Sequence, residues 1–105
     1  MLVNPMFFVQ RQHIIERAAK QRLPTIYEWK PFVQSGGLIS YGADVPDVYR
    51  RAAGLVDKIL KGAKPGDLSV EGPKLFDMAV NLKAAKALGV TIPDSVVKQA
   101  VLVIE

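Results

Sequence analysis

The chain has 105 residues, half of them apolar, with 14 basic and 10 acidic side chains, a net charge of +4 and no cysteine. This length suits one compact domain or a part of one, and it excludes a large multi-domain enzyme. The lack of cysteine excludes disulfide frameworks, cysteine-based zinc sites and thiol nucleophiles.

The basic side chains are spread along the chain, most of them close in sequence to an acidic one. This pattern favours solvated helix faces over a binding surface for nucleic acid, so we expect no nucleic-acid partner. No apolar run approaches the roughly 20 residues that span a bilayer. The first residues also lack the basic region and long apolar core of a signal peptide.

Leu2-Val3 followed by Asn4-Pro5 is typical of a strand end broken by a proline turn. A strand that begins at the first residue suggests that the chain starts within a larger fold. Apolar residues at helical spacing then predict an amphipathic helix from about Val9 to Arg22. The next elements expected in chain order are a strand over residues 24–27, a helical turn over 29–34 and a strand over 38–41 that Gly42 ends.

The clearest signals define a helix that follows Asp44, a residue able to cap it, and stops at Gly62. Gly54 in its middle is expected to pack closely against a neighbour, since glycine weakens a helix. After a polar connector, the pattern predicts a strand over residues 75–80, then a helix capped by Asn81 and ended by Gly89. Residues 96–104 are so rich in β-branched side chains that helix and strand both stay open.

This alternation predicts an α/β fold, with a Rossmann-like, mostly parallel sheet flanked by helices. Parallel strands would bring their carboxyl ends to one edge, where ligands bind in such folds. Aromatic and amide side chains dominate that edge and describe a pocket for a flat or apolar group with polar contacts. The residues expected there are Asn4, Met6, Phe7, Tyr27, Glu28, Trp29, Tyr41, Gly42 and Asn81.

Arg11 is expected on the core-facing side of the first helical turn, near the same edge. A guanidinium in that place needs a partner, which is either a neighbouring carboxylate or carbonyl, or an anionic group of a ligand. Both interpretations stay open. The candidate ligand-binding residues are therefore Asn4, Phe7, Arg11, Tyr27, Glu28, Trp29 and Tyr41.

Other candidates for chemistry give little support to an enzyme. His13, the one histidine, falls on the solvent side of its helix. With one histidine and no suitably spaced carboxylate cluster, we expect no metal site and no cofactor. Glu28 and Asp44 are better read as residues near helix starts than as an acid–base pair. The glycines near residues 36 and 62 match neither phosphate-loop pattern, so the chain is expected not to be an enzyme.

Several sequence blocks, taken in order, resemble the C-terminal third of the ABC-transporter substrate-binding protein family that includes tryptophan-binding members. The blocks are Asn4 to Phe8, Leu23 to Trp29, Gly36 to Gly42, Tyr49 to Ala53, Lys58 to Pro65, and Asn81 to Gly89 with Ile92-Pro93. The resemblance covers essentially the whole chain. Each block is weak alone, but six in the same order and at matching spacing are specific.

The resemblance implies a fragment of a type I periplasmic binding fold, in which a solute such as an amino acid binds between two lobes. It implies that residues 1–35 and 75–105 belong to one lobe and that 36–74 supply a strand and a helix to the other. It also implies an ABC permease as partner, and a periplasmic or lipid-anchored extracytoplasmic location for the full-length protein. No signal peptide is visible in this chain.

Two further expectations concern the assembly of the fragment and an alternative function. A sheet cut from its partner strands tends to pair with another chain, so we expect a homodimer or swapped assembly of the isolated fragment. The alternative to a solute receptor is a stand-alone α/β regulatory or enzymatic subunit, with a cofactor at the carboxyl edge of its sheet.

Overall fold

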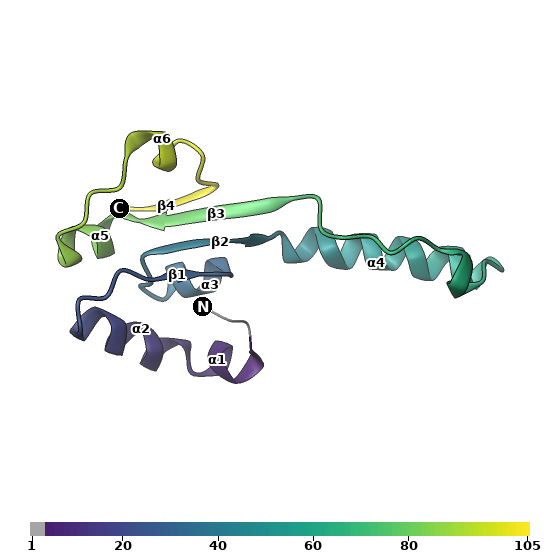
Figure 1. Cartoon of the computed structure of the whole chain (residues 1–105), viewed down its shortest axis with the longest axis horizontal. Helices are drawn as coiled ribbons and strands as arrows, with labels where there is room; N and C mark the ends of the chain where they lie inside the picture. The colour runs from purple at the N-terminus through teal and green to yellow at the C-terminus, as the bar shows by residue number, and fades with distance from the viewer. Residues whose placement is uncertain (1–3) are drawn as a thin grey trace. The chain divides into compact units, whose positions relative to one another are not determined.

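A computed structural model describes residues 4–105 of the chain. The strand end expected at Leu2-Val3 lies outside these residues. The described chain forms a four-stranded sheet with helices, which confirms the α/β fold class (Figure 1). In chain order, its elements are α1 (Pro5–Val9), α2 (Arg11–Lys20), β1 (Ile26–Tyr27), α3 (Lys30–Gln34), β2 (Ile39–Ala43), α4 (Val45–Leu60), the 3-10 turn η1 (Pro65–Asp67), β3 (Phe76–Asn81), α5 (Leu82–Leu88), α6 (Asp94–Val97) and β4 (Leu102–Ile104).

The N-terminal segment differs from the expected proline turn and single helix. Asn4 is the N-cap of α1, and its Oδ1 accepts a hydrogen bond from the Met6 backbone N–H at 2.8 Å. Pro5 occupies the first helical position, where its missing N–H costs nothing. The Asn-Pro pair therefore starts a helix. The expected helix over 9–22 is in fact α2, which is separated from α1 at Gln10.

The helices predicted from capping signals are confirmed. Asp44 caps α4 by accepting from the Asp47 backbone N–H at 2.9 Å, and Gly62 follows its end with a φ of 107°. Asn81 caps α5 in the same way, and Gly89 ends it with a φ of 72°. Gly54 does not fit its expected role, because nothing lies within 4 Å of a Cβ added there.

The segment left open between helix and strand contains both. A short helix, α6, ends at Val97, and β4 begins at Leu102. β4 pairs with β3 in parallel, with Val103 opposite Val80. The β-branched residues of this segment are therefore divided between a helical turn and an edge strand of the sheet.

The strand order is β1-β2-β3-β4, and two of these three neighbouring pairs, β1 with β2 and β3 with β4, are parallel. β2 and β3 run in opposite directions: the Asn81 N–H donates to the Leu38 carbonyl oxygen, and the Asp44 N–H donates to that of Leu75. Figure 1 draws their arrows accordingly. The expectation of one common carboxyl edge is therefore wrong for β3, and Asn81 lies at the opposite edge from the ends of β1 and β2.

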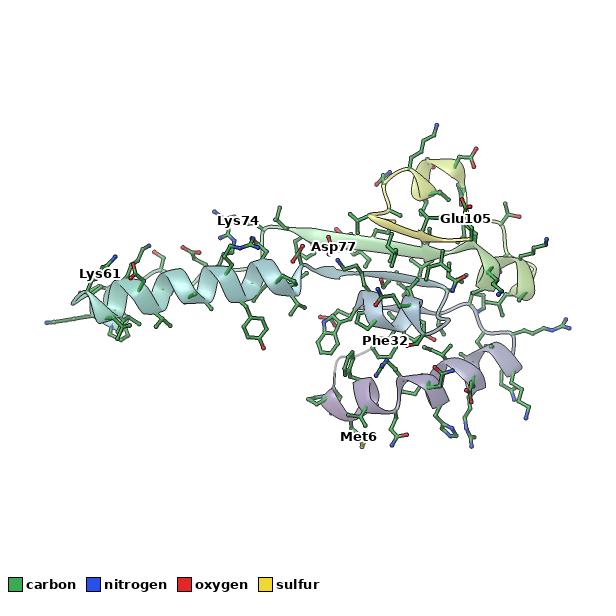
Figure 2. The ribbon with its side chains drawn as sticks, turned by 180° about the vertical axis from the view of Figure 1, so that it is seen from behind. Met6, Phe32, Lys61, Lys74, Asp77 and Glu105 are labelled. Carbon is green, nitrogen blue, oxygen red and sulfur yellow. The ribbon has the colours of Figure 1, made fainter. Side chains whose placement is uncertain are left out.

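The chain divides into two compact units, one of residues 1–42 with 77–105 and one of residues 43–76. The first holds the buried core in two clusters. One surrounds Leu38, Val80, Ala85 and Ile92, against which α6 also packs. The other joins Ile15 of α2 to Tyr27 and Phe32 (Figure 2).

Candidate functional site

The carboxyl ends of β1 and β2 form one edge of the sheet, called here the carboxyl edge and defined by Glu28, Trp29, Tyr41 and Gly42. Their parallel register sets Tyr27 opposite Ser40, so the residues that follow each come to the same end. Glu28 and Tyr41 are exposed there, Tyr41 to 52%, while Trp29 is half-buried. The carboxyl edge therefore presents a carboxylate and aromatic side chains from two adjacent strands.

Gly42 is what allows the two strand ends to approach this closely. A Cβ added at Gly42 would come within 2.1 Å of the Glu28 carbonyl oxygen. Only glycine leaves room for a backbone at this distance. The position of Glu28 thus depends on a residue in the neighbouring strand.

An ion pair lies next to this contact. Lys30 Nζ, at the start of α3, is 2.5 Å from Asp77 Oδ2 on β3, and only 14% of the Asp77 side chain is exposed. The antiparallel hydrogen bonds between β2 and β3 set Asp77 opposite Gly42. Sequence reasoning missed this pair, because it depends on the direction of β3. Figure 2 labels Asp77 on that strand.

Tyr27 is buried rather than presented at the surface. Its ring is 2% exposed and stacks on Phe32, with centroids 4.9 Å apart. Its hydroxyl accepts a hydrogen bond from Thr25 Oγ1 at 2.8 Å. The ring thus belongs to the core beneath the carboxyl edge, and the ligand contact expected of it stays a prediction.

Phe8 links α1 to the carboxyl edge. Its ring meets Trp29 edge-on, with centroids 5.4 Å apart, and Phe32 at 6.2 Å. Phe7, the predicted neighbour, is half-buried, and Asn4 is exposed with its side chain used as the α1 cap. The sequence alone offers no means of choosing Phe8 over Phe7, because both follow Pro5 in a helix too short to show a periodicity.

Arg11 ties three helical segments together. Its Nε donates to Ser35 Oγ at 3.1 Å, its Nη1 donates to the Phe8 carbonyl oxygen at 3.1 Å, and its guanidinium lies 4.8 Å from the centre of the Phe8 ring. No carboxylate of residues 4–105 pairs with it. The half-buried Arg11 guanidinium is therefore partnered by a hydroxyl, a carbonyl and an aromatic ring. Contact of Arg11 with a ligand stays a prediction.

An apolar groove of this unit lies away from the carboxyl edge. It has a volume of about 190 Å³ and is lined by side chains of α2 and α5 together with Leu23, Thr25, Tyr27 and the chain before β2. Apart from Tyr27 in β1, these residues precede β1 and β2 or follow β3, and the lining includes none of the four residues that define the carboxyl edge. The groove and the carboxyl edge are therefore two separate surfaces.

His13 lies exposed on α2, where its Nε2 accepts a hydrogen bond from Arg17 Nε at 3.0 Å. Residues 4–105 contain no group of three or more side chains arranged to hold a metal ion. Within the same range, no helix has both the length and the apolar character needed to cross a membrane.

Comparison with protein families and with solved structures identifies the proteins that this chain is similar to. A family profile described as "ABC transporter substrate binding protein" matches residues 5–104. A crystal structure of a conserved domain protein from Vibrio cholerae is 29% identical, with a TM-score of 0.87, over 96% of this chain and 34% of that one. An ABC domain from Streptococcus pneumonia, solved in complex with L-Trp, is also 29% identical with a TM-score of 0.87, over 98% of this chain and 35% of its own.

A third structure supports the fold alone. The ligand-free, open form of a substrate-binding protein with adhesive properties from Clostridium difficile is 20% identical, with a TM-score of 0.63, over 97% of this chain and 34% of that one. No curated protein sequence matches the chain significantly. The chain spans about a third of the length of the solved structures that it resembles.

Proposed function

Because the chain belongs to the ABC transporter substrate-binding protein family, we propose that it is part of the solute-binding component of an ABC importer. In this function the protein binds a small polar or aromatic solute and passes it to a membrane permease without changing it chemically. The family is one of binding proteins rather than enzymes. The stand-alone subunit considered from the sequence has no comparable support.

The observation that carries the proposal is the carboxyl edge itself. Glu28, Trp29 and Tyr41 come from two adjacent parallel strands, and all of them keep surface open to solvent. An aromatic ring offers a flat apolar face, and a carboxylate accepts hydrogen bonds from an N–H or ammonium donor. This combination suits an amino acid, and the similar Streptococcus structure is a complex with L-Trp.

We extend the proposal to a two-lobed organisation, with the solute between the lobes. Residues 1–35 and 75–105 would belong to one lobe, and residues 36–74 would supply a strand and a helix to the other. The separation of residues 43–76 as a compact unit supports the assignment of α4 to a second part of the molecule, while residues 36–42 group with the first unit. The coverage of about a third of the similar structures supports a larger, two-lobed whole. In this arrangement Asn4, Phe7 and Arg11 contribute ligand contacts from the same lobe as Glu28 and Trp29.

The partners and location follow from this function. The full-length protein would be extracytoplasmic, either periplasmic or lipid-anchored, and would deliver its solute to an ABC permease. A solute held between two lobes is covered on both sides, whereas a single lobe leaves one side of it in water. We therefore place high-affinity binding in the complete polypeptide rather than in these 105 residues.

A thermal-shift screen of the complete polypeptide against amino acids and other small solutes tests the proposal. A ligand at 100 times its dissociation constant stabilises the native state by about 2.7 kcal/mol, which is readily seen as a rise in Tm. We expect one class of solute to raise the Tm. If no amino acid or related small solute shifts it, the proposed function is contradicted.

A further inference from the structure

Both ends of the short helix α3 are held by the junction of α1 and α2. Trp29 directly precedes α3, and Ser35 directly follows it. The Phe8 ring meets Trp29 with centroids 5.4 Å apart, and Arg11 Nε donates to Ser35 Oγ at 3.1 Å. Phe8 and Arg11 lie on either side of Gln10, where α1 ends and α2 begins. One short stretch of chain therefore contacts both ends of α3.

Arg11 also joins these two contacts to each other. Its Nη1 donates to the Phe8 carbonyl oxygen at 3.1 Å, and its guanidinium lies 4.8 Å from the centre of the Phe8 ring, a cation–π contact. The hydrogen bond to Ser35 Oγ restricts the plane of the guanidinium, because the N–H groups of arginine have a rigid, planar arrangement. The order of the Phe8 ring therefore depends in part on Ser35.

The Trp29 side chain takes its orientation from the rings around it. It is half-buried between β1 and α3 and packs against the cluster of Ile15, Tyr27 and Phe32. Phe8 meets it edge-on, with an interplanar angle of 71°, and Phe8 in turn contacts Phe32 at 6.2 Å (Figure 2). An edge-on aromatic contact has a preferred geometry, so it limits the directions in which the indole can turn.

We propose that Phe8 and Arg11 are positioning residues for Trp29, which they hold in the orientation that meets the solute; the inference rests on the proposed function. A binding surface whose side chains are already ordered loses less conformational entropy when the solute binds. Loosening the contacts of Phe8 therefore lowers the affinity without removing a group that touches the solute. Ser35, at the far end of α3 from Trp29, influences solute binding in the same way.

Ser35→Ala separates this positioning from direct contact with the solute. It removes the acceptor of Arg11 Nε but leaves the charge of Arg11 and the ring of Phe8 in place. Calorimetry of the complete polypeptide uses L-Trp, the molecule bound in the similar Streptococcus structure, or another amino acid if the thermal-shift screen selects it. We expect binding at least about twofold weaker, and at most the roughly tenfold that one such hydrogen bond is worth. Gln34→Ala, at the exposed neighbouring position, should leave the affinity unchanged.

The same substitution in a Trp29→Leu background shows whether Ser35 acts through Trp29. If it does, Ser35→Ala has no further effect on affinity once the indole is absent. An effect of equal size in both backgrounds would mean that Ser35 acts on the fold as a whole, and this overturns the proposal. An unchanged affinity in Ser35→Ala alone overturns it as well.

Fluorescence reports the order of Trp29 directly, because Trp29 is the one tryptophan of these 105 residues. In the complete polypeptide without solute, with any other tryptophan replaced, Phe8→Leu and Ser35→Ala should shift the emission to longer wavelengths and make acrylamide quench it more strongly. Val9→Ala, which shortens a 74% exposed side chain of the same helix, should change neither. Unchanged emission and quenching in Ser35→Ala overturn the proposal, and this variant decides alone if Phe8→Leu fails to fold.

The fluorescence measurement needs no solute, so the two proposals can fail separately. Altered Trp29 emission in a protein that binds no amino acid or related solute overturns the proposed function alone. Solute binding with unaltered Trp29 emission in Ser35→Ala overturns this inference alone.

Discussion

The carbonyl oxygen of Glu28 lies in the space that a side chain at Gly42 would fill, 2.1 Å from the Cβ that any other residue would place there. This contact fixes the first residue after β1 against β2. Because the Glu28 carbonyl belongs to the backbone, it cannot move away from a new side chain by changing rotamer. The geometry of the carboxyl edge thus depends on one glycine.

Replacement of Gly42 tests this dependence. Gly42→Ala forces the end of β1 away from β2, and we expect it to destabilise the fold by about 1–3 kcal/mol, as overpacking does elsewhere. Urea unfolding followed by circular dichroism measures the change. A variant that unfolds at the same urea concentration as the wild type would show that Glu28 moves aside freely.

The opposite result is expected at Gly54. This residue lies in the middle of α4 with nothing within 4 Å of an added Cβ, so alanine introduces no clash. Gly54→Ala should stabilise the helix by roughly 1 kcal/mol, the difference in helix propensity. Far-ultraviolet circular dichroism during unfolding measures this gain. A loss of stability would mean that a neighbour from elsewhere in the polypeptide approaches Gly54.

The two capping asparagines should differ in importance. Asn81 is 5% exposed, accepts from the Ala84 N–H at 2.9 Å and donates through Nδ2 to the Val33 carbonyl oxygen at 3.4 Å. Asn81→Ala removes the cap and the buried hydrogen bond to the Val33 carbonyl oxygen, which still accepts from the Gly36 N–H, so we expect a loss of about 2 kcal/mol. Asn4 caps an exposed helix, and Asn4→Ala should cost about 1 kcal/mol or less. Chemical denaturation compares them, and equal losses would contradict this account.

The Lys30–Asp77 pair should contribute more than the surface pairs do. Lys30→Met leaves a carboxylate that is only 14% exposed without its cation, and we expect a loss of about 1–3 kcal/mol at neutral pH. The double variant with Asp77→Asn should recover part of this loss. Lys61→Met serves as a control, because Lys61 and Asp57 are both largely exposed and such pairs contribute at most about 1 kcal/mol. Similar losses of stability from the two lysine variants would contradict the larger contribution expected of the Lys30–Asp77 pair.

Local signals predicted the parts of this fold that local contacts determine. Asp44 and Asn81 act as caps and Gly62 and Gly89 follow helix ends, since each of these needs only a few neighbouring residues. The direction of β3 could not be predicted in the same way. A strand joined by a helix normally returns parallel, but here the segment after α4 runs back along it until the Leu75 carbonyl accepts from the Asp44 N–H.

The candidate site was predictable to the same extent. The positions of Glu28, Trp29 and Tyr41 at one edge follow from the parallel pairing of β1 with β2, which the strand pattern indicated. The burial of Tyr27 and the partners of Arg11 depend on how α1, α2 and α3 pack. The spacing of residues in the sequence does not predict this packing. The ion pair of Lys30 with Asp77 depends on strand direction and was missed for the same reason.

Amide hydrogen exchange of the complete polypeptide, with and without the solute found by thermal shift, can show whether the carboxyl edge binds the solute. If the carboxyl edge binds the solute, exchange slows at residues 28–30 and 41–43 when the solute is added, while α5 at the other end of the strands is unchanged. If protection falls instead on the groove between α2 and α5, or nowhere in these residues, the carboxyl edge is not the binding surface.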